Sequence, residues 1–181
     1  DHGMEFFERE TWGQGNSVLV DDSSRIPLIV VDPRHADSHT ISHTVRSIDV
    51  APTLLDMVGL PIPEEMEGVS LKKCIHGQIT DPGLAAYAET GIWVTRVPSL
   101  EEDHITYPDL PDLLEIPDKR DGTLTIKTIY KDMIISAKDR MVRTDRWKLV
   151  YLPMHHGVSR RLFDLKTDAG CQHDVSALHP D

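Results

Sequence analysis

Two side chains that commonly bind metal ions stand next to each other at the first two positions of this sequence. Asp1 and His2 are followed by Gly3, whose backbone freedom allows the chain to turn directly after them. A carboxylate oxygen and an imidazole nitrogen both ligate divalent cations, and adjacent positions hold them close together. Asp1 and His2 are therefore candidate metal ligands.

The elements that must position this pair are predicted from the apolar patterns that follow it. The run 25–31 is almost continuously apolar and ends at Asp32-Pro33, which predicts a buried strand. Residues 47–59 predict a helix: Ser47 or Asp49 can cap it, Pro52 lies in its first turn, and a glycine ends it. Its expected apolar face is formed by Val50, Leu54, Leu55 and Val58. A second, short helix is expected over 70–76.

The composition changes near residue 80, after which strands are expected to dominate. Short β-type runs cover 84–88, 91–95, 123–130, 133–136, 141–143, 147–152 and 161–165. His155-His156-Gly157 separates the last two and predicts an antiparallel hairpin. Residues 98–122 are rich in proline and acid and predict a long excursion. We therefore expect two parts, 1–80 and 81–181, with the excursion in the second.

Histidines offer a second possible kind of metal site. His35, His39 and His43 recur every fourth residue, so they would share one face if this segment were a helix. The segment is polar and follows a proline, which favours a variable surface loop instead. His155 and His156 could serve a second metal ion, although a hairpin loop explains their position more simply.

Bulk composition excludes several classes of protein. The 181 residues carry a formal net charge of −11, with acids in runs such as 64–67 and 101–103, so a nucleic-acid partner is not expected. No run of about 18 apolar residues predicts a membrane span. The two cysteines, Cys74 and Cys171, are far apart and form neither a zinc motif nor a disulfide framework, so both are expected to be free thiols.

Several blocks in this order resemble the sulfatase family, within the alkaline-phosphatase superfamily. The blocks of the first part are Asp1-His2-Gly3, Trp12-Gly13-Gln14-Gly15, Arg25-Ile26-Pro27-Leu28-Ile29-Val30, 49–56 and 67–71. Residues 141–151 and 162–165 are similar to strands of the sulfatase C-terminal subdomain. The resemblance implies an α/β fold: the C-terminal part of an alkaline-phosphatase-like mixed sheet with flanking helices, followed by a small antiparallel β-sheet subdomain.

The resemblance also implies roles for residues. Sulfatases hold one divalent cation, usually calcium, and Asp1 and His2 would be two of its ligands. Gln14 occupies a position where many sulfatases carry a lysine that contacts the substrate; it could donate a hydrogen bond there without a charge, or merely hold its loop. Arg25 could reach the substrate anion, although such an arginine more often forms a salt bridge to a neighbouring element.

The family nucleophile lies in a Cys- or Ser-x-Pro-x-Arg motif, which this sequence lacks. The chain therefore looks like part of a larger sulfate-ester hydrolase, with a missing N-terminal half as its partner, and by itself it is expected to be inactive. One alternative is a phosphoryl-ester hydrolase or transferase of the same superfamily, with zinc or manganese, since Gln14 weakens the sulfate case. Another is a non-catalytic structural module.

Overall fold

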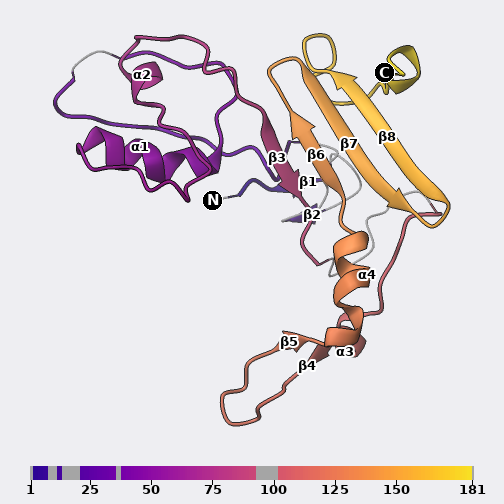
Figure 1. Cartoon of the computed structure of the whole chain (residues 1–181). Coiled ribbons are helices and arrows are strands. Elements are labelled where there is room, and N and C mark those ends of the chain that lie inside the picture. Colours follow the sequence, from indigo (N-terminus) through magenta and orange to yellow (C-terminus); the bar gives the residue numbers. More distant parts are fainter. Residues whose placement is uncertain (1, 8–11, 14–20, 36–37, 93–101, 181) are drawn as a thin grey trace. The chain divides into compact units, whose positions relative to one another are not determined.

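The chain is a mixed α/β protein with short helices and small sheets (Figure 1). The computed structural model describes residues 2–7, 12–13, 21–35, 38–92 and 102–180. It divides into two compact units: one holds Asp1–Ile26, Ala88–Met141 and Lys148–Asp181, and the other holds Pro27–Tyr87 and Val142–Trp147. Among the described residues, no helix has the length and apolar character needed to cross a bilayer.

A four-stranded sheet in the order β3-β6-β7-β8 carries the principal core. Its strands are β3 (Ala86–Glu89), β6 (Arg140–Arg143), β7 (Trp147–Met154) and β8 (Gly157–Asp164). The predicted hairpin is confirmed, because only His155 and His156 join β7 to β8, and so short a loop requires antiparallel strands.

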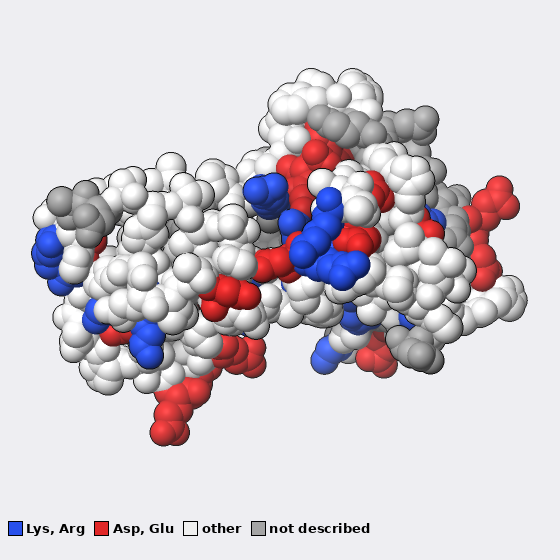
Figure 2. Space-filling view, turned by 90° about the horizontal axis from the view of Figure 1, so that it is seen from above, with Lys and Arg blue, Asp and Glu red and all other residues white. Residues whose placement is uncertain are grey.

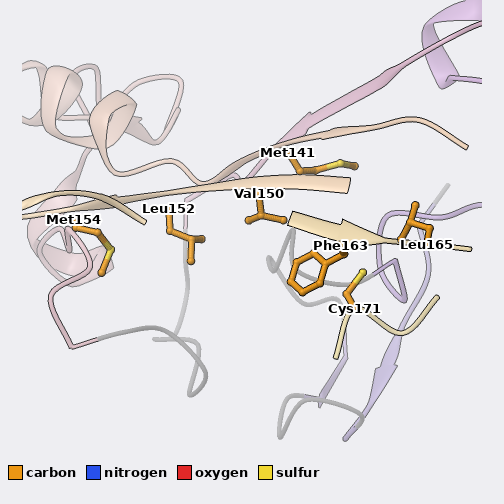
Figure 3. Close-up of a cluster of buried hydrophobic side chains, with 7 residues drawn as sticks. All are labelled: Met141, Val150, Leu152, Met154, Phe163, Leu165 and Cys171. Atoms are coloured by element: carbon orange, nitrogen blue, oxygen red, sulfur yellow. The ribbon is translucent and has the colours of Figure 1, made fainter. Parts of the chain in front are cut away.

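Side chains alternate along β7, as a half-buried strand requires. Lys148, Val150 and Leu152 lie on its buried face, whereas Leu149 is exposed. Figure 3 shows the core that this face helps to form. Its buried members are Met141, Val150, Leu152, Met154, Phe163, Leu165 and Cys171. Cys171 is a free thiol inside this cluster, and Cys74 is a buried free thiol elsewhere.

The predicted helix over 47–59 is confirmed as a 3-10 turn, η1 (Ser47–Asp49), that runs into α1 (Val50–Met57). The fully buried Asp49 carboxylate accepts the Arg46 backbone N–H at 3.0 Å and the Val69 N–H at 2.9 Å. Gly59 follows the helix with φ +76°. The expected apolar face was wrong: Leu54 and Val58 are exposed, and Pro52, Thr53 and Met57 are buried.

The short helix predicted over 70–76 is confirmed as α2 (Lys72–Ile75). The N-cap position is Leu71, and Ser70 just before it accepts the Lys72 backbone N–H on its Oγ at 3.2 Å.

The excursion over 98–122 is organised where it is described. It contains α3 (Leu110–Leu113) and β4 (Leu114–Glu115), which pairs antiparallel with β5 (Thr125–Ile126). The fully buried Leu113 anchors it. His104 forms an antiparallel bridge with Met154 of β7, so the start of the excursion is tied to the main sheet.

The chain between β5 and β6 is helical, with η2 (Thr128–Tyr130) leading into α4 (Lys131–Ser136). The expectation of a strand over 133–136 was therefore wrong. The apolar residues at 129–130 and 133–135 suit the periodicity of a helix as well as that of a strand over so short a run. Only Ile134 of α4 is buried. The last element is η3 (Ser176–Leu178).

The prediction of a buried strand over residues 25–31 was also wrong. The segment has no regular secondary structure and is exposed throughout, with Ile29 85% and Val31 83% exposed. A buried strand requires neighbours on its edges and faces. No strand among the described residues pairs with this segment.

Candidate functional site

The turn of the Asp-His-Gly motif packs tightly against residues 21–25. Gly3 N–H donates to the Ser23 carbonyl oxygen at 2.9 Å, and a Cβ at position 3 would lie 1.8 Å from the Asp22 carbonyl oxygen. A side chain at position 3 would thus collide with backbone, which cannot yield as a flexible side chain could. Glycine at this position is what allows the motif to pack here.

The His2 imidazole has a geometry that suits a metal ligand. Its Nδ1 lies 2.8 Å from the Gly3 carbonyl oxygen. A carbonyl can only accept a hydrogen bond, so Nδ1 carries the proton and the lone pair of the neutral ring is on Nε2. This arrangement, in which one ring nitrogen donates to a carbonyl, is typical of histidines that bind a metal through the other. Asp1, the expected second ligand, lies outside the described residues.

Glu5 supports the same turn and was not anticipated from the sequence. It lies in β1 (Glu5–Phe6), which pairs antiparallel with β2 (Trp12–Gly13), and it is fully buried. Ser23 Oγ donates to Glu5 Oε1 at 3.1 Å. The only sequence signal that Glu5 might be buried was its position between two apolar residues, Met4 and Phe6.

A buried ion pair fixes the other side of the 21–25 turn. Lys148 of β7 is fully buried, and its Nζ lies 3.0 Å from Asp21 Oδ1. The Arg25 backbone N–H closes the turn on the Asp21 carbonyl oxygen at 2.8 Å. The turn that contacts Gly3 is therefore anchored to β7, one of the two inner strands of the main sheet.

The two expected substrate-binding residues differ in what the structure shows. Gln14 lies outside the described residues. Arg25 is exposed, at the end of the 21–25 turn, and its guanidinium makes no ion pair with a described residue. The alternative expectation, a salt bridge from Arg25 to a neighbouring element, is thus not seen within the described part of the chain.

The three regularly spaced histidines do not share one face. His39 Nε2 lies 2.9 Å from the Cys74 carbonyl oxygen, His35 stacks near His76, and His43 contacts Asp145. The segment is not helical in its described residues, so the spacing of four has no geometric consequence. The expectation of a loop is confirmed.

His43 binds Asp145, which lies in the connection between β6 and β7. Its Nδ1 lies 2.6 Å from Asp145 Oδ2 and 3.6 Å from Asp81 Oδ1, and the Thr44 N–H donates to Asp145 Oδ1 at 2.6 Å. The hydrogen bond with Asp145 raises the pKa of His43, and the charge of Asp81 adds to this. Burial acts to raise the pKa of Asp145, but hydrogen bonds from His43 and Thr44 outweigh it and lower that pKa.

These shifts predict a pH-dependent contribution of His43 to stability. A folded-state pKa above the unfolded value of about 6.5 means that the contribution is complete below about pH 6.5 and is lost as the pH rises through the folded pKa. We expect His43→Gln to lower the urea midpoint most at about pH 5.5 and least at about pH 9. The exposed His155→Gln is the matched control, and a His43→Gln effect that stays constant or grows with pH would contradict this account.

Acidic and basic side chains are intermixed on the surface. On the face shown in Figure 2, described Lys and Arg side chains lie beside Asp and Glu side chains, and they form no continuous basic stripe there. Ion pairs such as Lys138 with Glu89 show the same intermixing.

Comparison with known proteins connects these features to a family. Residues 14–87 match the family model described as "N-sulphoglucosamine sulphohydrolase, C-terminal". Arylsulfatase K of Gallus gallus is 25% identical over 183 residues, which cover all of this chain and 27% of that protein. A 2,3-bisphosphoglycerate-independent phosphoglycerate mutase of Rippkaea orientalis is 37% identical over 71 residues, which cover 36% of this chain and 13% of that enzyme.

A solved structure shows the same fold. The structure of BT1596, a 2-O GAG sulfatase, superposes with a TM-score of 0.60 at 20% identity, covering 99% of this chain and 30% of that one.

Residues 14–87 match the C-terminal part of a sulfatase family, and the whole chain is similar to arylsulfatase K, as the ordered motifs indicated. More particularly, it corresponds to the C-terminal portion of such a protein and is homologous to arylsulfatase K. It spans 27% of the length of the arylsulfatase K that it matches over its whole length. Enzymes of this superfamily are typically metal-dependent, which agrees with the chemistry of the Asp-His pair.

Proposed function

We propose that this chain contributes to a hydrolase that cleaves a sulfate ester with one divalent cation, calcium, and that Asp1 and His2 are two of the cation's ligands. The observation that carries the proposal is the packing of Gly3 against the 21–25 turn, which holds the adjacent imidazole with its proton on Nδ1. The similarity to arylsulfatase K and the order of the sequence blocks support it.

Residues of this chain would have two kinds of role: to bind the cation and to hold the turn that positions it. His2 keeps its Nδ1 proton on the Gly3 carbonyl and presents Nε2 for ligation. Glu5 and Ser23 hold the turn, and the pair of Lys148 and Asp21 anchors it. When bound, the cation would stabilise negative charge on an ester oxygen. Gln14 and Arg25 would contact the substrate anion from the same part of the chain.

The nucleophile must come from outside this sequence, since no Cys- or Ser-x-Pro-x-Arg motif occurs in it. We therefore propose that residues 1–80 complete a catalytic α/β domain, that residues 81–181 form its C-terminal subdomain, and that the missing N-terminal half is the obligatory partner. The 181-residue chain alone should not turn over substrate.

Phosphoryl-ester chemistry is the second candidate, and two observations favour it. Gln14 stands where many sulfatases carry lysine, and a phosphoglycerate mutase is 37% identical over 71 residues. In that case zinc or manganese would be the expected cation.

An assay of the intact protein separates the two candidates. Aryl sulfate and aryl phosphate esters are offered in parallel after chelation and after addition of calcium, manganese or zinc. Turnover of sulfate sustained by calcium supports the sulfatase proposal, whereas turnover of phosphate sustained by zinc or manganese replaces it with the second candidate.

Within the intact protein, we expect Asp1→Ala to lower kcat/KM by at least about 100-fold, because cation catalysis contributes several kcal/mol to transition-state stabilisation. Excess cation should recover part of the loss. Glu64→Ala, which removes a carboxylate exposed on a surface turn, is the control and should leave turnover unchanged. Full turnover by Asp1→Ala would refute the ligand assignment.

A further inference from the structure

A tight turn places a carboxylate and an imidazole on the same side of the chain at residues 32–35. The His35 backbone N–H donates to the Asp32 carbonyl oxygen at 3.0 Å, and Pro33 occupies the position in this turn that its fixed φ favours. Asp32 and His35 are three residues apart, so the turn brings their side chains together. Arg34 lies on the turn between them.

His76 joins these two residues from the end of α2. Its backbone N–H donates to the Lys72 carbonyl oxygen at 2.9 Å, and Gly77, with φ +66°, ends the helix directly after it. His76 Nε2 lies 3.9 Å from Asp32 Oδ2, and the rings of His35 and His76 have centroids 4.0 Å apart. One ligand atom from each of the three side chains lies within 4.8 Å of the other two.

Two of the three side chains are largely buried and His35 is exposed, and the site contains a polar atom that the described residues do not satisfy. The Asp32 side chain is 4% exposed and that of His76 is 13% exposed. His76 Nε2 is buried and has no hydrogen-bond partner among the described residues, since 3.9 Å is too long for a hydrogen bond. Buried nitrogens without a partner are rare because they are costly, which points to a missing partner here.

We propose that Asp32, His35 and His76 bind a divalent transition-metal ion, with zinc as the best fit. Two imidazole nitrogens and one carboxylate oxygen are ligands that zinc accepts, with a fourth position left for water. Bonds of about 2.0–2.1 Å in tetrahedral geometry separate ligand atoms by about 3.4 Å. The ligand atoms, which lie within 4.8 Å of one another, would therefore need to approach by up to about 1.4 Å around the ion.

The charges around the site are compatible with a cation. Hydrogen bonds from Arg34 hold the pKa of Asp32 far below its usual range, so the carboxylate is ionised and able to ligate. Arg34 Nη2 donates to Asp32 Oδ2 at 2.8 Å and to the Met57 carbonyl oxygen at 2.9 Å. Each carboxylate oxygen has two lone pairs, so Asp32 Oδ2 can accept the hydrogen bond from Arg34 and bind a metal ion at the same time. Asp56 is a second anion near His76, although Lys72 Nζ pairs with its Oδ1 at 2.9 Å.

A second group of metal-binding residue types, formed by His43, Asp81 and Asp145, provides an internal comparison. The carboxylates there are 56% and 38% exposed, and His43 Nδ1 is already engaged by Asp145 at 2.6 Å. Exposed carboxylates and an occupied ring nitrogen make this group the poorer zinc site. It supplies the matched control for the test.

The test is equilibrium dialysis of the 181-residue chain against zinc, followed by metal analysis, with cobalt(II) as a spectroscopic probe. We expect one zinc per chain and the intense visible absorption of four-coordinate cobalt. Because loss of an outer-shell partner weakens metal binding by about 10–100-fold, His76→Ala and His35→Ala should each weaken zinc binding by more than about 10-fold. His43→Ala should change it little.

Circular dichroism confirms that each variant is folded, and the exposed position of His35 ensures that at least one ligand variant can be interpreted. Zinc binding that survives both His35→Ala and His76→Ala, or that is lost in His43→Ala instead, would overturn the proposal. So would the absence of zinc and cobalt binding by the unmodified chain. The outcome is independent of sulfate-ester hydrolysis, because Asp1 and His2 are unchanged in every variant.

Discussion

Replacing Lys148 with methionine will lower the free energy of unfolding by about 3 kcal/mol, because it removes one partner of a buried ion pair and leaves the other in place. Lys148 is fully buried, and Asp21 is 19% exposed, so water can relieve only part of the loss. The measurement is urea denaturation at neutral pH.

A double variant isolates the reason for this loss. If the cost comes from stranding a carboxylate, Lys148→Met combined with Asp21→Leu should recover most of the lost stability, since apolar replacement of a whole buried pair is often neutral. Lys138→Met is the control, because its ion pair with Glu89 is partly exposed. A Lys148→Met loss no larger than that control, or no recovery in the double variant, would contradict the assignment.

Replacing His104 with alanine will also destabilise the chain by about 3 kcal/mol or more. His104 is 1% exposed; its Nε2 lies 2.6 Å from Asp139 Oδ1, and its Nδ1 lies 2.7 Å from the Ile105 carbonyl oxygen. The alanine variant therefore loses a large buried ring and leaves the buried Asp139 carboxylate without this partner.

The chain contains a matched control for this experiment in the neighbouring histidine–aspartate pair. His156 Nδ1 lies 2.8 Å from Asp103 Oδ1, but the two side chains are 88% and 42% exposed. His156→Ala should therefore cost less than about 1 kcal/mol. Equal losses in the two variants, measured by urea denaturation, would show that burial is not what makes the His104 pair important.

Local sequence signals predicted the elements that depend on local interactions. The helix over 47–59 was predicted from a capping Ser47 or Asp49, from Pro52 and from Gly59. Pro52 and Gly59 act within that segment, whereas the Asp49 side chain accepts N–H groups from residues 46 and 69 on either side of it. The hairpin was predicted from a short polar loop between two alternating runs. In contrast, residues 25–31 were mistaken for a buried strand because an apolar run shows only that burial is needed, not which partners provide it.

The candidate site was only partly predictable for the same reason. Adjacent residues such as Asp1 and His2 can be recognised from their order in the sequence. The groups that support the site come from distant positions: Lys148 pairs with Asp21 across 127 residues, and His104 pairs with Asp139 across 35. Nothing in the local pattern around a lysine in a strand identifies its carboxylate partner, because the fold alone brings the two together.

The exposed segment at 25–31 has a consequence for how a cell would handle this chain. Ile29 and Val31 are exposed in a largely apolar run without regular secondary structure, which is the type of surface that quality-control chaperones bind. As long as this run is exposed, chaperones would recognise the chain as incompletely folded. Its lifetime would then be set by how quickly another surface covers Ile29 and Val31, rather than by the stability of its own core.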